Sequence, residues 1–418
     1  MQVEKIKKEK VFIVALNLKP SPLSETEESL NELEALAATL NFCVMGRVIQ
    51  SRNIPDQRTF IGKGKLHEVE DVVEELGIDI VLFDSELTPK QGQILEESLG
   101  CRVWDRTQVI LEIFARHART SESKVQVELA RLEYMMPRLV GMWSHLDRER
   151  GGISASRGMG EKQINVDRKI ARTSIGKLKK ELEKIVKERQ TQKKKRGDCF
   201  QIAIIGYTNA GKSTLMNLLT GNNLLVEDRL FATLESTTRM LKGITKPETV
   251  ISDTVGFIRN LPHGLVASFR STLDVVKDAD LILHVTDANH PLVEEHISTT
   301  LDVLKEIEGG DIPSILVLNK SDLIKDQIKK LILERKHPDA VMLSSFDIKT
   351  KNILIDKIKI FFQDQFISRK VKLPYSKSEK LANFYEHAVV ENISYLDDAM
   401  HIDCVISKIN KRRFAGLL

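Results

Sequence analysis

The sequence feature that most constrains this chain is a Gly-x-x-x-x-Gly-Lys-Ser string at residues 206–213. A β-rich apolar run precedes it at residues 200–205, and a helix-favouring stretch follows at residues 214–219. In that context the glycines let backbone N–H groups turn inward around a phosphate, and the start of the helix adds positive potential. The string therefore predicts an α/β domain in which a strand, a phosphate-binding loop and a helix follow one another.

Further apolar runs in the same part of the chain are each of strand length. Helical lengths separate them, and this alternation is typical of a mostly parallel sheet covered by helices. We therefore expect one domain over residues 197–366. Besides 200–205, its predicted strands are residues 249–253, 281–287, 315–319 and 340–343.

The first part of the chain shows the same alternation, which predicts a smaller α/β domain over residues 1–118. In one of its helices Thr88 is a suitable cap and Pro89 suits the first helical position. A Gly-Lys-Gly-Lys string at residues 62–65 could hold an anion, but it fits a surface turn or an RNA phosphate contact better than a second nucleotide site. The predicted strands are residues 11–18, 43–50, 79–83 and 101–104, and the predicted helices are 24–40, 65–76, 88–99 and 105–117.

A segment of different composition lies between these two parts. Residues 124–136 and 163–189 carry helix-favouring residues at helical spacing, and glycines interrupt the pattern between them. We expect a helical hairpin over residues 119–196 with a glycine-rich tip at 154–160. Residues 168–196 hold 13 Lys or Arg against 3 Glu, although the net charge of the whole chain is only +4. Such a basic arm suits RNA phosphates, but by itself it is equally compatible with a solvated helix face.

The remaining residues, 367–418, are expected to form a small α+β domain with a helix at 381–391 and a strand at 400–406. The four cysteines lie far apart in the sequence, so neither a disulfide framework nor a zinc site is indicated. No apolar run approaches the roughly 18 residues that a membrane helix needs. Together these features favour a cytoplasmic protein without stable membrane insertion.

Two short motifs follow predicted strands in the 197–366 domain. Residues 253–256 read Asp-Thr-Val-Gly, which supplies a carboxylate for magnesium and a backbone N–H that can sense a γ-phosphate. Residues 319–322 read Asn-Lys-Ser-Asp, whose last carboxylate can accept hydrogen bonds from the N1–H and the amine of guanine. Adenine lacks that pair of donors and would leave the carboxylate unpaired. Because the three motifs occur in this order in one α/β unit, they predict a guanine nucleotide site.

The chain resembles the HflX family of ribosome-associated GTPases. The motifs that carry the resemblance are Phe-Ala-Thr-Leu at 231–234, Asp-Thr-Val-Gly-Phe-Ile-Arg at 253–259, Leu-Pro-His at 261–263, Gly-Gly-Ile at 151–153 and Arg-Gly-Met-Gly-Glu at 157–161, together with the phosphate loop. The resemblance implies a multi-domain α/β protein with an N-terminal domain, a helical hairpin and a P-loop GTPase domain. It also implies GTP-dependent binding to the large ribosomal subunit and the splitting of stalled or idle ribosomes.

The motifs assign roles to individual residues. Lys212 would bridge the β- and γ-phosphates, while Ser213 and Asp253 would hold Mg²⁺, the expected cofactor. Thr233 is our choice for the second magnesium ligand, although Thr237 and Thr238 are rivals that spacing does not exclude. We expect catalysis to depend on Lys212, Thr233 and Gly256. The residues expected to contact GTP are Gly206, Tyr207, Thr208, Asn209, Ala210, Gly211, Lys212, Ser213, Thr214, Phe231, Ala232, Thr233, Leu234, Glu235, Asp253, Thr254, Val255, Gly256, Asn319, Lys320, Ser321, Asp322, Ser344 and Ser345.

Position 257 bears on the rate of hydrolysis. Many signalling GTPases have glutamine there to orient the attacking water, whereas this chain has Phe257, which cannot hydrogen-bond water. We expect slow hydrolysis by the protein alone and stimulation by the ribosome, in a monomer that does not bind DNA. The alternatives are a GTPase switch that acts in ribosome assembly or on other RNA or protein partners, and a metabolic P-loop enzyme.

Overall fold

The structure is a computed structural model that describes residues 8–138, 157–196, 199–221, 230–231, 237–241, 249–259, 275–344, 347–363, 366–396 and 398–407. The chain divides into two compact units. Unit 1 comprises Met1–Glu188, Glu227–Glu235 and Ile258–Ser271. Unit 2 comprises Arg189–Val226, Ser236–Phe257 and Thr272–Leu418.

Unit 1 contains a four-stranded parallel sheet in the order β2-β1-β3-β4. Its two central strands, β1 and β3, are apolar and buried over nearly their whole length, as expected when both faces are covered. The predicted strands of this part are therefore present. Their bounds are β1 Lys10–Leu18, β2 Cys43–Arg52, β3 Ile80–Phe83 and β4 Arg102–Asp105.

Four helices accompany these strands, and two of them begin at side-chain caps. Helix α3 begins with the predicted Thr88 cap, which forms a capping box with Gln91, and Pro89 occupies the first turn. Helix α4 begins after Asp105, whose carboxylate accepts from the Gln108 backbone N–H. The bounds are α1 Leu23–Thr39, α2 Lys63–Leu76, α3 Pro89–Leu99 and α4 Arg106–His117.

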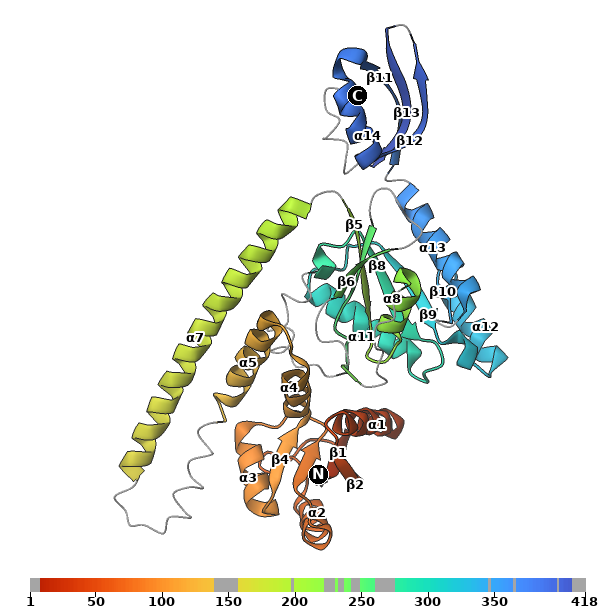
Figure 1. The fold of residues 1–418 in the computed structure, drawn as a ribbon. Coiled ribbons are helices and arrows are strands. Elements are labelled where there is room, and N and C mark those ends of the chain that lie inside the picture. The colour runs from red at the N-terminus through yellow and green to blue at the C-terminus, as the bar shows by residue number, and fades with distance from the viewer. Residues whose placement is uncertain are drawn as a thin grey trace, which may run out of the picture. The chain divides into compact units, whose positions relative to one another are not determined.

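The predicted helical hairpin corresponds to α5 (Ser121–Met135) and the long helix α7 (Arg157–Arg196), drawn in Figure 1. Within unit 1, Lys179 of α7 forms a 2.8 Å ion pair with Glu133 of α5. The predicted glycine-rich tip is partly wrong, because residues 157–160 are already helical. Two glycines cost a helix only about 1 kcal/mol each, which a helix of this length can absorb. The rest of the predicted tip lies outside the described residues.

Unit 2 is built on a six-stranded sheet in the order β10-β9-β8-β5-β7-β6. All its pairs are parallel except β6 with β7. The strands are β5 Phe200–Gly206, β6 Thr237–Met240, β7 Thr249–Asp253, β8 Leu281–Asp287, β9 Ser314–Asn319 and β10 Val341–Met342. The helices are α8 Lys212–Thr220, α11 Val293–Glu306, α12 Gln327–Lys336 and α13 Ile348–Gln363. One apolar cluster joins the sheet to α8 and α13, and a second joins it to α11 and α12.

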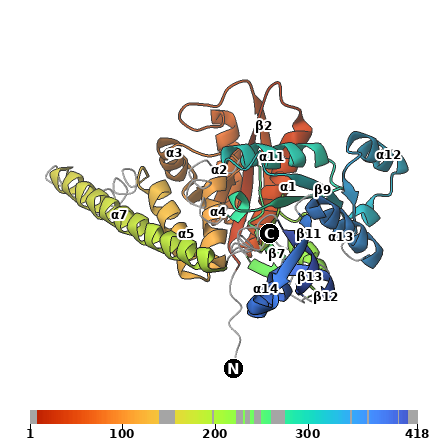
Figure 2. The same cartoon turned by 90° about the horizontal axis from the view of Figure 1, so that it is seen from above.

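The end of the chain forms an antiparallel sheet, β11-β13-β12, on which α14 packs (Figure 2). The strands are β11 Phe366–Pro374, β12 Ala388–Tyr395 and β13 Ala399–Ser407, and α14 is Leu381–His387. The helix predicted at 381–391 is therefore too long, and residues 388–391 are strand instead. The β-branched Val389 and Val390 pair with β13, and this long-range pairing overrides the local helical spacing.

The fold is therefore multi-domain α/β with mostly parallel sheets. Among the described residues, no helix is both long enough and apolar enough to cross a membrane.

Candidate functional site

Three strands of unit 2 end at the same edge of the sheet, and each ends at a predicted motif. Gly206 closes β5, Asp253 closes β7 and Asn319 closes β9. Because these strands are parallel, their carboxyl ends meet at one edge, where ligands bind in open α/β sheets. The fold thus brings together motifs that are up to about a hundred residues apart in the sequence.

The loop after β5 needs glycine at two positions. A Cβ on Gly206 would lie 1.9 Å from the Val285 carbonyl oxygen. Gly211 has a φ of +89°, and a Cβ there would lie 2.2 Å from Asn319 Nδ2. Only glycine accommodates such close approach together with a positive φ. The loop then runs directly into α8, so the helix N-terminus faces the ligand position.

Lys212 is the first residue of α8, and its side chain is buried. Its ammonium donates to the Tyr207 carbonyl oxygen at 2.8 Å. Burial lowers the pKa of Lys212 to about 8, and the nearby Asp253 carboxylate offsets part of this effect. A buried cation with so few anionic neighbours is suited to receive phosphate oxygens.

Ser213 and Asp253 bring a hydroxyl and a carboxylate together beside the phosphate loop. The Ser213 hydroxyl donates to Asp253 Oδ2 at 2.6 Å, and Asp253 is buried at the end of β7. Hydroxyl and carboxylate oxygens are hard ligands that suit Mg²⁺, which typically takes only one or two protein ligands beside substrate phosphates. The described residues contain no group of three or more His, Cys, Asp or Glu placed to bind a metal. This donor set therefore fits Mg²⁺ held jointly with a nucleotide.

The segment after Asp253 is held against the phosphate loop by two backbone hydrogen bonds. The Thr208 N–H donates to the Phe257 carbonyl at 2.7 Å, and the Phe257 N–H donates to the Gly206 carbonyl at 3.0 Å. The Phe257 ring is buried, so it is a packing residue. Thr254 is also structural, since its hydroxyl donates to the Ile204 carbonyl at 2.8 Å. Gly256 lies close to the loop, where a Cβ would lie 2.8 Å from Lys212 Nζ and 2.9 Å from Thr208 Cα.

The Asn-Lys-Ser-Asp motif is joined directly to the phosphate loop. Asn319 is buried, and its amide donates to the Ala210 carbonyl at 2.8 Å. Lys320 has a φ of +55° and pairs with Asp287 of β8 at 2.9 Å. Asp322 is exposed, so its carboxylate is accessible to a ligand. The Ser321 N–H donates to the carbonyl of Leu343, just before the buried Ser344.

Two contributors to this site were not predicted from the sequence. The Asp287 carboxylate pairs with Lys320 and holds its side chain in place. Asp287 could have been found from the sequence, because it ends the predicted strand at 281–287. The imidazole of His296, on α11, stacks on the Tyr207 ring with centroids 3.7 Å apart. No sequence pattern indicated that contact, because α11 follows the loop by more than eighty residues.

The structure describes little of the predicted Phe-Ala-Thr-Leu element. Phe231 belongs to unit 1, where its buried ring makes an edge contact with Phe114 at 4.8 Å. The rival threonines, Thr237 and Thr238, lie on β6, and the Thr238 hydroxyl is 2.8 Å from the Ser252 hydroxyl. The predicted contacts that lie outside the described residues are Ala232, Thr233, Leu234, Glu235 and Ser345.

The chain is similar to known GTPases. Three family models match the chain: "GTP-binding GTPase N-terminal" over residues 27–115, "GTP-binding GTPase Middle Region" over 117–196, and "50S ribosome-binding GTPase" over 201–320. GTPase HflX of Flavobacterium psychrophilum is 44% identical over 325 residues, which cover 78% of each chain. GTPase HflX of Escherichia coli is 39% identical and covers 87% of this chain and 86% of that protein.

A solved structure of a GTP-binding protein from the archaeon Sulfolobus solfataricus in complex with GDP is 27% identical. The match covers 84% of this chain and 97% of that one, with a TM-score of 0.43. The relatives share identity across most of their length, and the three motifs of unit 2 stand together at one sheet edge. This chain therefore belongs to the HflX family of GTPases and is an enzyme that hydrolyses GTP.

Proposed function

We propose that this GTPase binds the large ribosomal subunit in its GTP form, separates stalled or idle ribosomes, and is released by hydrolysis. The observation that carries the proposal is a guanine nucleotide site in the same chain as a strongly basic helix. The family model matched over residues 201–320 is described as a 50S ribosome-binding GTPase, which supports this partner over others.

In this proposal the motif residues act on the nucleotide as a set. Lys212 bridges the β- and γ-phosphates, and the Gly256 N–H senses the γ-phosphate. Ser213 and Asp253 hold Mg²⁺, with Thr233 as the second hydroxyl ligand. The ion neutralises charge on the phosphates. The support is the 2.6 Å Ser213–Asp253 contact and the burial of Lys212 beside it.

In this proposal the Asn-Lys-Ser-Asp motif at the end of β9 selects guanine over adenine. Asp322 accepts from the guanine N1–H and amine, while Asn319 and Lys320 hold the loop in place. The support is that Asp322 is exposed, whereas Asn319 and Lys320 are fixed by the Ala210 carbonyl and the Asp287 carboxylate.

Hydrolysis by the protein alone should be slow. Phe257 stands where many GTPases place glutamine, and its ring is buried in packing. The partner would then supply groups that orient water or stabilise charge, an effect worth about 10³ to 10⁵ in rate when it is an arginine.

The ribosomal partner is inferred from charge. Residues 168–196 of α7 carry 13 basic and 3 acidic side chains, and most of the described ones between 168 and 188 are exposed. Such a helix neutralises several phosphates with little sequence readout, as expected for ribosomal RNA. Because the ribosome is its proposed partner, we place the protein in the cytoplasm. We also propose that it acts as a monomer and does not bind DNA.

Co-sedimentation with purified ribosomal subunits tests the proposal. Binding to the large subunit should be stronger with a non-hydrolysable GTP analogue than with GDP, and it should weaken steeply as salt rises. The matched variant reverses Lys177, Lys180 and Lys184 to glutamate, which should abolish binding while leaving GDP affinity unchanged. Equal binding with both nucleotides would contradict the proposal.

The second candidate function is ribosome assembly, which the same basic helix allows. It would be favoured if the protein bound precursor particles more tightly than mature large subunits. Light scattering of intact ribosomes separates the two directly, since only the proposed function predicts that GTP and the protein lower the scattering by splitting them.

A further inference from the structure

The ring of Tyr207 in the phosphate loop is the inner member of a stack of three rings. The imidazole of His296, on the first turn of α11, lies nearly parallel to it, with an interplanar angle of 5°. The imidazole of His290, in the loop between β8 and α11, follows with its centroid 4.1 Å from that of His296. Tyr207 and His296 are only 4% and 6% exposed, so their contact is buried inside unit 2.

The backbone of the same tyrosine holds the lysine of the phosphate loop. The Tyr207 carbonyl oxygen accepts from Lys212 Nζ at 2.8 Å and from the Ala210 N–H at 3.3 Å. Because the allowed side-chain rotamers depend on the local backbone, a ring that is held in one orientation restrains the backbone dihedrals of its own residue. The stack on the Tyr207 ring therefore restrains the carbonyl that fixes Lys212.

The outer ring of the stack is held by contacts of its own. His290 Nδ1 accepts from the Leu292 N–H at 3.1 Å, and Lys329 of α12 donates to the His290 carbonyl at 3.1 Å. The loop that carries His290 follows Asp287, which pairs with Lys320 of the Asn-Lys-Ser-Asp motif. The stack is therefore fixed at one end by the phosphate loop and at the other by a loop that is attached to the guanine motif.

Helix α11 also contributes apolar side chains to the core, apart from this stack. Val293 and Ile297 of α11 belong to the second apolar cluster of unit 2, together with Leu318 of β9. His296 instead places a flat ring against the ring of Tyr207, in a contact that depends on orientation. Paired rings change an equilibrium about two- to tenfold beyond the effect of the area that they bury. The stack is therefore strong enough to influence nucleotide affinity.

We infer that His296 is a positioning residue for the nucleotide, acting on Lys212 through Tyr207. The stack keeps the Tyr207 carbonyl where it holds the Lys212 ammonium, so the lysine needs no rearrangement when the β- and γ-phosphates arrive. A group that is already in place loses less freedom when the ligand binds, and the affinity is higher for that reason. This role of His296 rests on the proposed contact of Lys212 with these phosphates.

The test compares GDP with GMP, which lacks the β-phosphate but keeps the base, the ribose and the α-phosphate. Affinities of the full chain are measured by competition with a fluorescent GDP analogue. His296→Leu keeps an apolar side chain but cannot stack, so it should weaken GDP binding about three- to tenfold and change GMP binding by less than about twofold. His296→Phe restores a flat ring and should return the GDP affinity to within about twofold of wild type.

Tyr207→Leu removes the same stack from the side of the phosphate loop, so it should show the same selective loss of GDP affinity. Combined with His296→Leu, it should lose no more than either single variant, because the two substitutions break one contact. Since the two variants alter different elements of unit 2, one of them reports on the stack even if the other does not fold.

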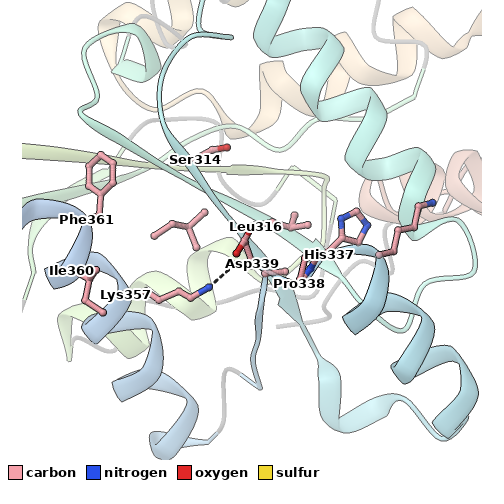
Figure 3. Close-up of a pocket in the computed structure, with 11 residues that line it drawn as sticks. Ser314, Leu316, His337, Pro338, Asp339, Lys357, Ile360 and Phe361 are labelled. Atoms are coloured by element: carbon pink, nitrogen blue, oxygen red, sulfur yellow. Dashed lines mark hydrogen bonds between the residues drawn. The ribbon is translucent and has the colours of Figure 1, made fainter.

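His337→Leu is the matched control. His337 also contacts α11, through Glu294 at 3.1 Å, and it lines a pocket together with Ser314 and Phe361 (Figure 3). This substitution removes a different histidine contact of the same helix. It should therefore leave the ratio of the GDP and GMP affinities unchanged, even where it lowers the unfolding free energy of unit 2.

Equal losses of GDP and GMP affinity in His296→Leu would overturn the inference, because they would make His296 a packing residue. A His296→Phe protein that regains no GDP affinity would overturn it too. Lys212→Ala separates this result from the proposed function and should remove most of the preference for GDP over GMP. If Lys212→Ala keeps that preference, the proposed role of Lys212 fails as well. If Lys212→Ala loses it and His296→Leu does not, only the role of His296 is wrong.

Discussion

If Lys212 contacts the nucleotide phosphates as proposed, its burial should make nucleotide affinity fall as the pH rises. Burial lowers its pKa to about 8 in the unliganded protein. Phosphate oxygens favour the charged ammonium, so nucleotide binding must raise this pKa again and take up a proton. With a pKa near 8, Lys212 is charged in roughly nine-tenths of the molecules at about pH 7 and in roughly one-tenth at about pH 9.

The affinity for GDP should therefore fall about tenfold between these two pH values, which is about 1.4 kcal/mol. Titration calorimetry in buffers of different ionisation enthalpy measures both the affinity and the proton uptake. Uptake should rise from about 0.1 proton at the lower pH to about 0.9 at the higher pH.

Lys212→Arg is the matched control. The guanidinium stays charged over this range, so its affinity should lack the tenfold fall even if its absolute value is lower. Ionisation of the guanine ring affects both proteins equally and cancels in the comparison. Parallel pH profiles for wild type and Lys212→Arg would refute the reasoning.

Three further substitutions test individual contacts. Asn319→Ala removes the buried bond to the Ala210 carbonyl and should weaken GDP binding by about 1–3 kcal/mol, measured by fluorescence titration. Phe257→Gln should not accelerate hydrolysis in single-turnover assays, because position 257 is buried, and it should lower the unfolding free energy of unit 2 by about 2 kcal/mol or more. Arg106→Ala removes the ion-pair partner of the buried Asp84 carboxylate, which keeps only its hydrogen bond from the Ser29 hydroxyl, and should lower the unfolding free energy of unit 1 by about 3–5 kcal/mol in urea, followed by tryptophan fluorescence.

Exposed residues of the same type are the controls for Asn319→Ala and Arg106→Ala. Asn289→Ala in unit 2 and Arg47→Ala in unit 1 should each change the measured quantity by less than about 0.5 kcal/mol. A Phe257→Gln protein that hydrolysed GTP faster than wild type would show that position 257 reaches the attacking water. An Arg106→Ala protein as stable as Arg47→Ala would show that the buried ion pair contributes no net stability.

Much of unit 2 was predictable because its signals are local. The strand, loop and helix around residues 206–213 follow one another within about twenty residues, and glycine is required where the backbone turns. The strand ends at Asp253 and Asn319 agree with the predicted bounds. Short apolar runs separated by helical lengths sufficed to locate them.

Two predictions failed because the local residue pattern did not decide the structure there. Residues 157–160 continue α7 despite two glycines, and residues 388–391 join β13 as a strand. Neither result follows from local propensity, since helix continuation depends on the whole length of the helix and strand pairing depends on a partner elsewhere in the chain.

By itself the sequence determined the family, the α/β class and the order of the nucleotide motifs, because each of these is recognised from short runs of adjacent residues. Only the tertiary structure decided that Asn319 holds the Ala210 carbonyl, that Asp287 holds Lys320, and that α12 turns its isoleucines outward. These contacts and exposures depend on which side chains lie together once the sheet and its helices have packed. Contacts between residues that are tens of positions apart arise from packing, and no local pattern encodes them.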